Sequence, residues 1–371
     1  MDGLVMDARE LLSTLVSIPS VTGEEGRLAA YLAELFEGAG GQVELREVEP
    51  GRSNLLVKIP GEGEPLLFMG HLDTVPPGSS WNTDPFTPCW RGSKVVGLGS
   101  CDMKGGVAAI VLALLTILNE KGRRRREAWA VFTVGEEVNS LGAYKAVEDW
   151  LLGKSFRLLV VPEPTSLAMG IAEKGVLWLR FALRGEGGHA SMAQGRRALE
   201  DGCRLALDVV TMVRSSSHHH PLLGEATAEI TQFHGGWKTN VIPSEASLDL
   251  DIRLVPGFDP SFLLEKVSTL LKERDLDCKV EVLNNRPPVE SVDSDALDAF
   301  ASAAKEVLGK EVEQVGLPYY SDVSAVVPRI DVPFVLFGPG DPCMAHTPGE
   351  WVDVEEVIRV AKVFERSILM L

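Results

Sequence analysis

The pattern of apolar and polar positions along the first 170 residues alternates between the period of a helix and that of a strand. Residues 8–15 and 24–39 have helical periodicity, and the second segment ends at a Gly-Gly pair, as helices commonly do. Five apolar runs predict strands, over residues 43–48, 54–58, 66–71, 128–134 and 157–161. Such alternation predicts an α/β layered domain with helices packed over a central sheet.

A different order of elements begins after residue 174. The patterns predict a strand, a helix, two strands, a helix and a strand, over residues 176–183, 197–213, 226–233, 246–254, 260–273 and 278–283. This βαββαβ order is typical of a ferredoxin-like domain. Helices and a strand then resume as far as residue 371. We therefore expect a discontinuous domain of residues 1–174 and 285–371, interrupted by an inserted α+β domain of residues 175–284.

Composition narrows the choice of partners and location. The formal charge of −17 argues against nucleic acid or an anionic membrane as partner, because both are bound by clustered Lys and Arg. The N-terminal residues lack the basic and apolar regions of a signal peptide, and the apolar run 107–118 indicates a buried helix shorter than a membrane span. Five scattered cysteines do not indicate a disulfide framework. We expect a cytoplasmic protein.

Residue types that bind metals follow three of the predicted strands. His71 ends strand 66–71, and Asp73 lies on the same side of the extended chain, where a carboxylate can hold the second ring nitrogen of a metal-binding imidazole. Glu136 and Glu137 follow strand 128–134, and Glu163 lies between two prolines after strand 157–161. Ligands in α/β sheets collect beyond the carboxyl ends of strands. Each motif alone is also compatible with an ordinary strand end or turn.

A glycine-rich turn at residues 97–106 leads into the predicted helix 107–118. It lacks the third glycine of a dinucleotide-binding loop, and Asp102 has the wrong charge to face a pyrophosphate. A carboxylate on a tight loop is suited to bridging two cations, but a helix N-cap explains Asp102 equally well. This segment alone does not decide between a cation-bridging residue and a helix N-cap.

Seven motifs occur in order along the chain, and together they are more specific than any one of them. They are His71-Leu72-Asp73-Thr74-Val75-Pro76, Asp102-Met103-Lys104-Gly105-Gly106, Glu136-Glu137, Pro162-Glu163-Pro164, Gly187-Gly188-His189-Ala190, Asn240-Val241-Ile242-Pro243 and Ala345-His346-Thr347-Pro348. This set resembles the M20 metallopeptidase family, which includes acetylornithine deacetylase, succinyl-diaminopimelate desuccinylase and glutamate carboxypeptidases. The resemblance implies a zinc-peptidase-like domain with a mixed central sheet flanked by helices, and an inserted lid and dimerisation domain.

The resemblance also implies a metal site. Two zinc ions per subunit, with cobalt or manganese as substitutes, would be bridged by Asp102. His71 and Glu163 would complete one site, and Glu137 and His346 the other. Two such metals, typically about 3.5 to 4 Å apart, lower the pKa of a shared water toward 7 and so generate a hydroxide.

Further roles follow from the same resemblance. Asp73 would orient His71, Glu136 would act as general base, and His189 would stabilise the oxyanion in the partner subunit of a homodimer. Substrate contacts are expected from Asn240, Arg253 and Gly338. After His189 the chain departs from many relatives, with Ala193 and Arg197 where they carry a proline and a later asparagine, so the substrate contacts near this point are less defined.

The expected activity is hydrolysis of the amide bond of a small N-acyl amino acid by a dinuclear zinc enzyme of the deacetylase or desuccinylase type. An M20 carboxypeptidase or dipeptidase acting on short peptides is the first alternative. Gly185 to Ala190 match the G-x-G-x-x-A pattern, so an NAD-dependent dehydrogenase is an alternative of another class. A catalytically inactive binding homologue is the third.

Overall fold

The computed structural model describes residues 6–120, 125–192 and 194–371. The expectations for the N-terminal residues and for Ala193 therefore concern positions outside the described residues. Contacts within the chain define two compact units. Unit 1 contains residues 1–171, 291–315 and 321–371, and unit 2 contains residues 172–290 and 316–320. That unit 2 serves as a lid or in dimerisation stays a prediction.

Unit 1 is built on a mixed sheet with the strand order β1-β2-β6-β3-β7-β19-β8. The strands are β1 (Gln42–Glu49), β2 (Arg52–Ile59), β3 (Glu62–His71), β6 (Arg126–Thr133), β7 (Leu158–Val161), β8 (Met169–Glu173) and β19 (Phe334–Leu336). The four central strands β6, β3, β7 and β19 run parallel to one another, whereas β1, β2 and β8 are antiparallel to their neighbours. The carboxyl ends of four strands therefore lie along one edge of the sheet. The α/β fold with a mixed central sheet is confirmed.

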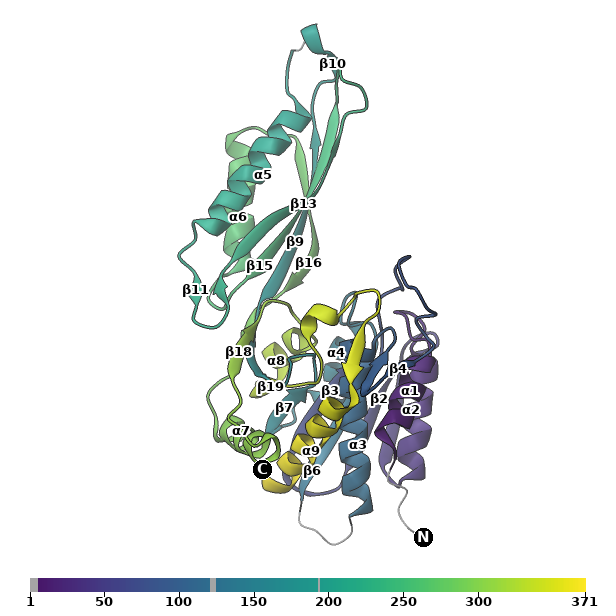
Figure 1. Cartoon of the computed structure of the whole chain (residues 1–371). Helices are drawn as coiled ribbons and strands as arrows, with labels where there is room; N and C mark the ends of the chain where they lie inside the picture. The colour runs from purple at the N-terminus through teal and green to yellow at the C-terminus, as the bar shows by residue number, and fades with distance from the viewer. Residues whose placement is uncertain (1–5, 121–124, 193) are drawn as a thin grey trace. The chain divides into compact units, whose positions relative to one another are not determined.

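Helices cover this sheet, as predicted. They are α1 (Ala8–Ser17), α2 (Gly26–Gly38), α3 (Gly105–Asn119), α4 (Leu141–Ala146), α7 (Asp295–Leu308), α8 (Val323–Ile330) and α9 (Val354–Met370). Figure 1 shows α3 and α9 side by side in front of the strands. The ring of Phe364 in α9 packs 5.1 Å, centroid to centroid, from that of Phe68 in β3. Large buried aromatic side chains of this kind contribute strongly to a core.

Helix α3 is apolar on nearly every side, which is typical of a helix buried within a domain. Together with the turn before it, the stretch Ser100–Asn119 is the one helical segment of the described chain that is long and apolar enough to cross a membrane. Of its most apolar window, 78% is buried inside the protein. The expected buried helix is therefore confirmed, and the expected cytoplasmic location stays a prediction.

Unit 2 contains an antiparallel sheet with the strand order β13-β15-β9-β16. Its elements are β9 (Gly175–Arg184), α5 (Ala198–Arg214), β13 (Thr227–Gly235), β15 (Glu245–Leu254), α6 (Pro260–Glu273) and β16 (Cys278–Arg286). Leu205 and Val209 of α5 pack with Phe181 and Leu248 of the sheet in one buried cluster. Spacing of four residues places Leu205 and Val209 on the same face of the helix. The elements follow one another in the predicted βαββαβ order.

Several short elements were not predicted. They are β4 (Cys89–Arg91), β5 (Lys94–Val96), β10 (Gly188–His189), β11 (His219–His220), β12 (Gly224–Glu225), β14 (Val241–Ile242), β17 (Val289–Glu290), β18 (Gln314–Leu317) and β20 (Trp351–Asp353). Strand β8, of five residues, and helix α4, of six, were also not predicted. Strands of two to four residues are too short to establish a period of two. Helix α8 was hidden by Pro328 in its interior, because proline normally interrupts a helical pattern.

Gly106 allows helix α3 to pack closely against the backbone just before Glu163, and the contribution of this packing to stability can be tested. A Cβ atom on Gly106 in the first turn of α3 would lie 2.2 Å from the carbonyl oxygen of Pro162, the residue before Glu163. We expect Gly106→Ala to lower the free energy of unfolding by about 1 to 3 kcal/mol, since the clash is with backbone. Gly38→Ala in α2 is the matched control, because nothing lies within 4 Å of a Cβ there. Urea denaturation of both variants measures this, and equal stabilities would contradict the expected clash.

Candidate metal centre

The residues expected to bind metal follow adjacent parallel strands of unit 1. His71 is the last residue of β3 and pairs with Thr133, the last residue of β6. Glu136 and Glu137 lie three and four residues after the end of β6, and Glu163 lies two residues after β7, the neighbour of β3 on its other side. Parallel pairing therefore places the three segments that carry the expected ligands next to one another at one edge of the sheet.

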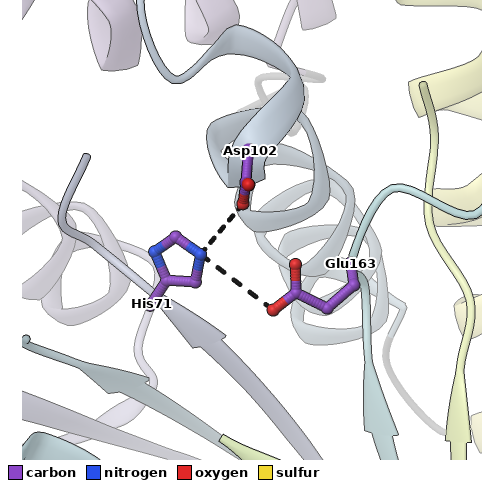
Figure 2. A group of neighbouring side chains, drawn as sticks. All are labelled: His71, Asp102 and Glu163. Atoms are coloured by element: carbon purple, nitrogen blue, oxygen red, sulfur yellow. Dashed lines mark hydrogen bonds and ion pairs between the residues drawn. The ribbon is translucent and has the colours of Figure 1, made fainter. Parts of the chain in front are cut away.

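The first candidate group contains His71, Asp102 and Glu163, whose side chains point toward one another (Figure 2). The Nε2 atom of His71 lies 3.1 Å from Oδ1 of Asp102 and 4.0 Å from Oε1 of Glu163. One ligand atom from each of the three residues lies within 4.8 Å of the others. His71 and Glu163 are buried, and Asp102 is nearly so.

The second group contains Asp102, Glu137 and His346 within the same limit of 4.8 Å. Nε2 of His346 lies 3.0 Å from the carboxylate of Glu137 and 3.4 Å from Oδ2 of Asp102. Asp102 thus presents one oxygen to each group. The His346 side chain is 49% exposed, whereas that of Glu137 is 7% exposed, so the second group lies nearer to solvent than the first.

Asp73 contacts both sides of this centre. Its backbone carbonyl oxygen lies 2.9 Å from Nδ1 of His71, and its carboxylate lies 3.6 Å from the same nitrogen. The carboxylate accepts hydrogen bonds from the backbone N–H groups of Glu136 at 3.0 Å and Glu137 at 3.1 Å. Thr22 donates a further hydrogen bond to it. Asp73 therefore fixes the loop after β6 as well as the ring of His71.

Glu136 differs from its neighbour Glu137. Its side chain is buried, but its carboxylate has no recorded hydrogen bond or ion pair within the described chain. Burial raises the pKa of Glu136 well above its ordinary value, and the negative charges of nearby carboxylates, Asp322 among them, add to the rise although His71 opposes it. A carboxylate with a raised pKa and free oxygens is suited to accept and return a proton near neutral pH.

The centre is an anionic cluster that two histidines compensate only in part. Burial also raises the pKa of Glu163 well above its usual range and raises that of Glu137. Hydrogen bonds to Asp102 and Glu137 raise the pKa of His346 to about 10. Within the described residues, no lysine or arginine forms an ion pair with any of these carboxylates. Like charges brought so close together in a buried site require a cation or protons.

The donors present fit a divalent metal. Two imidazole nitrogens and three carboxylates, one of them shared between the groups, are the ligand types that zinc accepts in proteins. The same set accommodates cobalt or manganese. Bound cations would neutralise the carboxylates, which supports these five residues as metal ligands.

The expected oxyanion donor His189 and the expected substrate ligand Asn240 lie together in unit 2. His189 of β10 pairs with Val241 of β14, and the carbonyl oxygen of Asn240 accepts a hydrogen bond from Ala190. Nδ1 of His189 accepts from the backbone N–H of Ser191 at 3.3 Å. That contact assigns the ring proton of a neutral imidazole to Nε2 and leaves Nε2–H as a donor on an exposed side chain.

Two other expected substrate contacts are engaged within the protein. Arg253 donates from Nε and Nη2 to the carboxylate of Asp251 at 2.8 and 2.9 Å. Gly338 is buried, and its N–H donates to Oγ1 of Thr165 at 3.1 Å. A Cβ there would lie 2.4 Å from the carbonyl oxygen of Glu163, so Gly338 permits close packing against the loop of Glu163. Substrate binding by both residues stays a prediction.

Two buried carboxylates near the centre were missed from the sequence. Asp322 accepts a hydrogen bond from Oγ1 of Thr133 at 2.7 Å, and burial raises its pKa. Glu350 lies four residues after His346 and is 1% exposed. Neither follows a recognisable metal-binding pattern. For Glu350, the one feature of the sequence that could have indicated burial is its place directly before the apolar Trp351 and Val352.

The dinucleotide-like pattern at Gly185 to Ala190 does not form a phosphate-binding loop. In place of a loop leading straight into a helix, Gly188 and His189 form β10, a short 3₁₀ turn follows, and α5 begins only at Ala198. A helix N-terminus at the loop is what binds a pyrophosphate. The dehydrogenase alternative therefore loses its structural basis.

Comparison with known proteins identifies relatives along the whole chain. The profile of peptidase family M20/M25/M40 matches residues 67–370. A probable succinyl-diaminopimelate desuccinylase of Staphylococcus aureus is 26% identical over 96% of both chains. Acetylornithine deacetylase of Aliivibrio salmonicida is 28% identical over 94% of both chains. The crystal structure of aminopeptidase PepT from Bacillus cereus has the same fold, with a TM-score of 0.81, 23% identity and 99% of both chains covered.

Asp73 contacts both the ring of His71 and the backbone after β6, so its replacement should disturb both parts of the candidate metal centre. We expect Asp73→Ala to lower zinc affinity by about 10- to 100-fold, because the loop with Glu137 and the ring of His71 both lose a support. The matched control is Asp84→Ala, an exposed loop aspartate that also accepts a backbone N–H in unit 1. Zinc content after dialysis against a weak chelator measures the effect. Equal retention of zinc by the two variants would contradict it.

Proposed function

The chain belongs to peptidase family M20/M25/M40 and is a metal-dependent hydrolase, and on that premise we propose that it cleaves the amide bond of a small N-acyl amino acid. The observation that carries this proposal is the convergence of His71, Asp102, Glu137, Glu163 and His346 into two groups that share Asp102. Relatives of similar length named as a desuccinylase and a deacetylase support the substrate class.

The proposed mechanism assigns a proton shuttle to Glu136. Divalent cations held by the five residues of the two groups would supply Lewis acidity, which would polarise the scissile carbonyl and make water a better nucleophile at neutral pH. Glu136 takes a proton from the attacking water and delivers it to the nitrogen of the leaving amine. Its buried carboxylate, with no recorded partner in the described chain, supports this assignment. Asp73 holds the Glu136 amide and so keeps the base in place.

Substrate recognition is proposed to use Asn240, Arg253 and Gly338. The two hydrogen bonds from Arg253 to Asp251 use Nε and Nη2, so Nη1 keeps both of its N–H donors for a substrate carboxylate. Asp251 at the same time holds the guanidinium in a fixed orientation. This arrangement supports a preference for substrates with a free carboxylate.

We also propose that the protein is a homodimer formed through unit 2, with His189 acting in the partner's site. Strand β13 is an edge strand that pairs only with β15 in the part of the chain that the structure describes. Ile230 and Phe233 on it are 40% and 37% exposed. An exposed apolar edge strand favours pairing with a second chain. The Nε2–H of His189 is a suitable donor to a developing oxyanion.

Replacement of Glu136 separates catalysis from metal binding. We expect Glu136→Gln to lower kcat by about 10²- to 10⁴-fold, because the amide cannot take a proton. Zinc content should stay at the wild-type level, since Glu136 belongs to neither metal group. Glu137→Gln, one residue away, should instead lower zinc content. Loss of zinc from Glu136→Gln would show that Glu136 is a ligand and not the base.

A substrate panel tests the proposed activity. The zinc-loaded protein should hydrolyse N-acetyl or N-succinyl amino acids with a higher kcat/KM than dipeptides and tripeptides with free amino termini. Amine release measured on matched pairs that differ only in the acyl group identifies the preference. Faster cleavage of peptides would favour the dipeptidase or carboxypeptidase alternative. Full zinc occupancy without turnover of any substrate would favour a binding protein.

Mixing two inactive variants tests the role of the partner subunit. A heterodimer of His189→Ala and Glu136→Gln chains contains one site with both groups intact, so subunit exchange should restore about a quarter of wild-type activity. Ile230→Lys should give monomers in light scattering, while Leu152→Lys, a 63% exposed leucine of unit 1, should not. Full activity of His189→Ala alone would remove His189 from the mechanism.

A further inference from the structure

Glu350 is a buried carboxylate of unit 1 that takes no part in the proposed chemistry. Its Oε1 accepts hydrogen bonds from the backbone N–H groups of Cys101 at 2.7 Å and Asp102 at 2.9 Å. Its Oε2 accepts a third from the N–H of Gly99 at 2.9 Å. All three amides belong to the loop that carries Asp102. One side chain therefore holds three of the four consecutive residues 99–102 by their backbone.

The backbone of Glu350 connects the same loop to the segment of His346. Its carbonyl oxygen accepts a hydrogen bond from Gly97 at 3.0 Å, and its N–H donates to the carbonyl oxygen of Thr347 at 3.1 Å. The next residue, Trp351 of β20, pairs with Val96 of β5. The segment that contains His346 and the loop that contains Asp102 are thus tied together at a single residue.

The buried lysine nearest in sequence to Asp102 does not take over this role. Nζ of Lys104 donates to the carbonyl oxygen of Ile18 at 2.9 Å, and no ion pair joins it to Glu350 among the described residues. The recorded hydrogen bonds of the Glu350 carboxylate all come from amides of the Asp102 loop. Three hydrogen bonds from one buried side chain fix the backbone of this loop at three of its residues, and leaving these buried N–H groups without an acceptor would be costly.

We propose that Glu350 is a positioning residue that fixes Asp102 relative to His346 and thereby sets the affinity of the Asp102, Glu137 and His346 group for a divalent cation. The inference rests on the proposed function, because it assumes that these residues bind metal. The second group depends on Glu350 more than the first, since His346 is on a half-exposed loop, whereas His71 ends a buried strand and Glu163 lies two residues after another.

The test is a zinc titration of the metal-free protein by calorimetry with a competing chelator. We expect Glu350→Ala to weaken binding of one zinc ion by about 10- to 100-fold while the other ion is affected less. Glu350→Gln should lose less zinc affinity than Glu350→Ala. The side-chain carbonyl oxygen of the glutamine can still accept hydrogen bonds from Cys101 and Asp102, while its NH₂ group faces the Gly99 amide. Glu355→Gln, five residues along and exposed, is the matched control and should bind zinc as the wild type does.

A purely structural role predicts a different result. A lower melting temperature of Glu350→Ala, with native circular dichroism and unchanged affinity for both zinc ions, would overturn the proposal. A wild-type protein that binds no zinc would overturn the proposed function as well. Wild-type binding of two ions with undiminished binding by both Glu350 variants would overturn the role of Glu350 alone.

Hydrogen exchange tests the proposal without any variant, and so applies even where Glu350→Ala does not fold. In the metal-free wild-type protein the amides of Gly99, Cys101 and Asp102 should exchange slowly, because Glu350 holds them whether or not metal is bound. Fast exchange of these three amides beside a protected helix α3 would overturn the proposal.

Discussion

The concentration of negative charge at one edge of the unit 1 sheet is the constraint on which the rest of the structure depends. Asp102, Glu136, Glu137 and Glu163 lie together in a largely buried site, and among the residues that the structure describes the basic groups that form ion pairs there are His71 and His346. Such an arrangement is costly without cations, because buried like charges repel strongly and cannot be screened by water. The fold must therefore supply both the force that holds these residues together and the geometry that makes cation binding favourable.

The scaffold meets this demand through backbone contacts more than through side-chain packing. Parallel pairing of β6, β3 and β7 fixes the starting points of three loops, and Asp73 then holds the amides after β6. Gly106 in helix α3 and Gly338 after strand β19 both allow close approach to the backbone of the Glu163 loop. Positions held by backbone hydrogen bonds and tight packing vary little, which is what a catalytic metal site requires.

The sequence predicted most of this scaffold because its long elements have clear periods. Strand β3 and helices α3, α5 and α9 are long enough to establish them, and the order of the seven motifs along the chain was sufficient to indicate the family. Three-residue strands such as β5 and β20 were missed, yet they bring Glu350 behind the Asp102 loop. The hydrogen bonds from the amides of Glu136 and Glu137 to Asp73 were also not predicted, because backbone donors leave no trace in residue identity.

The central claim is that two divalent cations balance these carboxylates at the ends of the parallel strands. Anomalous diffraction at the zinc absorption edge, from crystals of the zinc-loaded protein, tests it most directly. We expect two anomalous peaks in each chain, one bound by His71 and Glu163, one bound by Glu137 and His346, and both in contact with Asp102. Absence of peaks at this position, or zinc bound only by other residues, would contradict it.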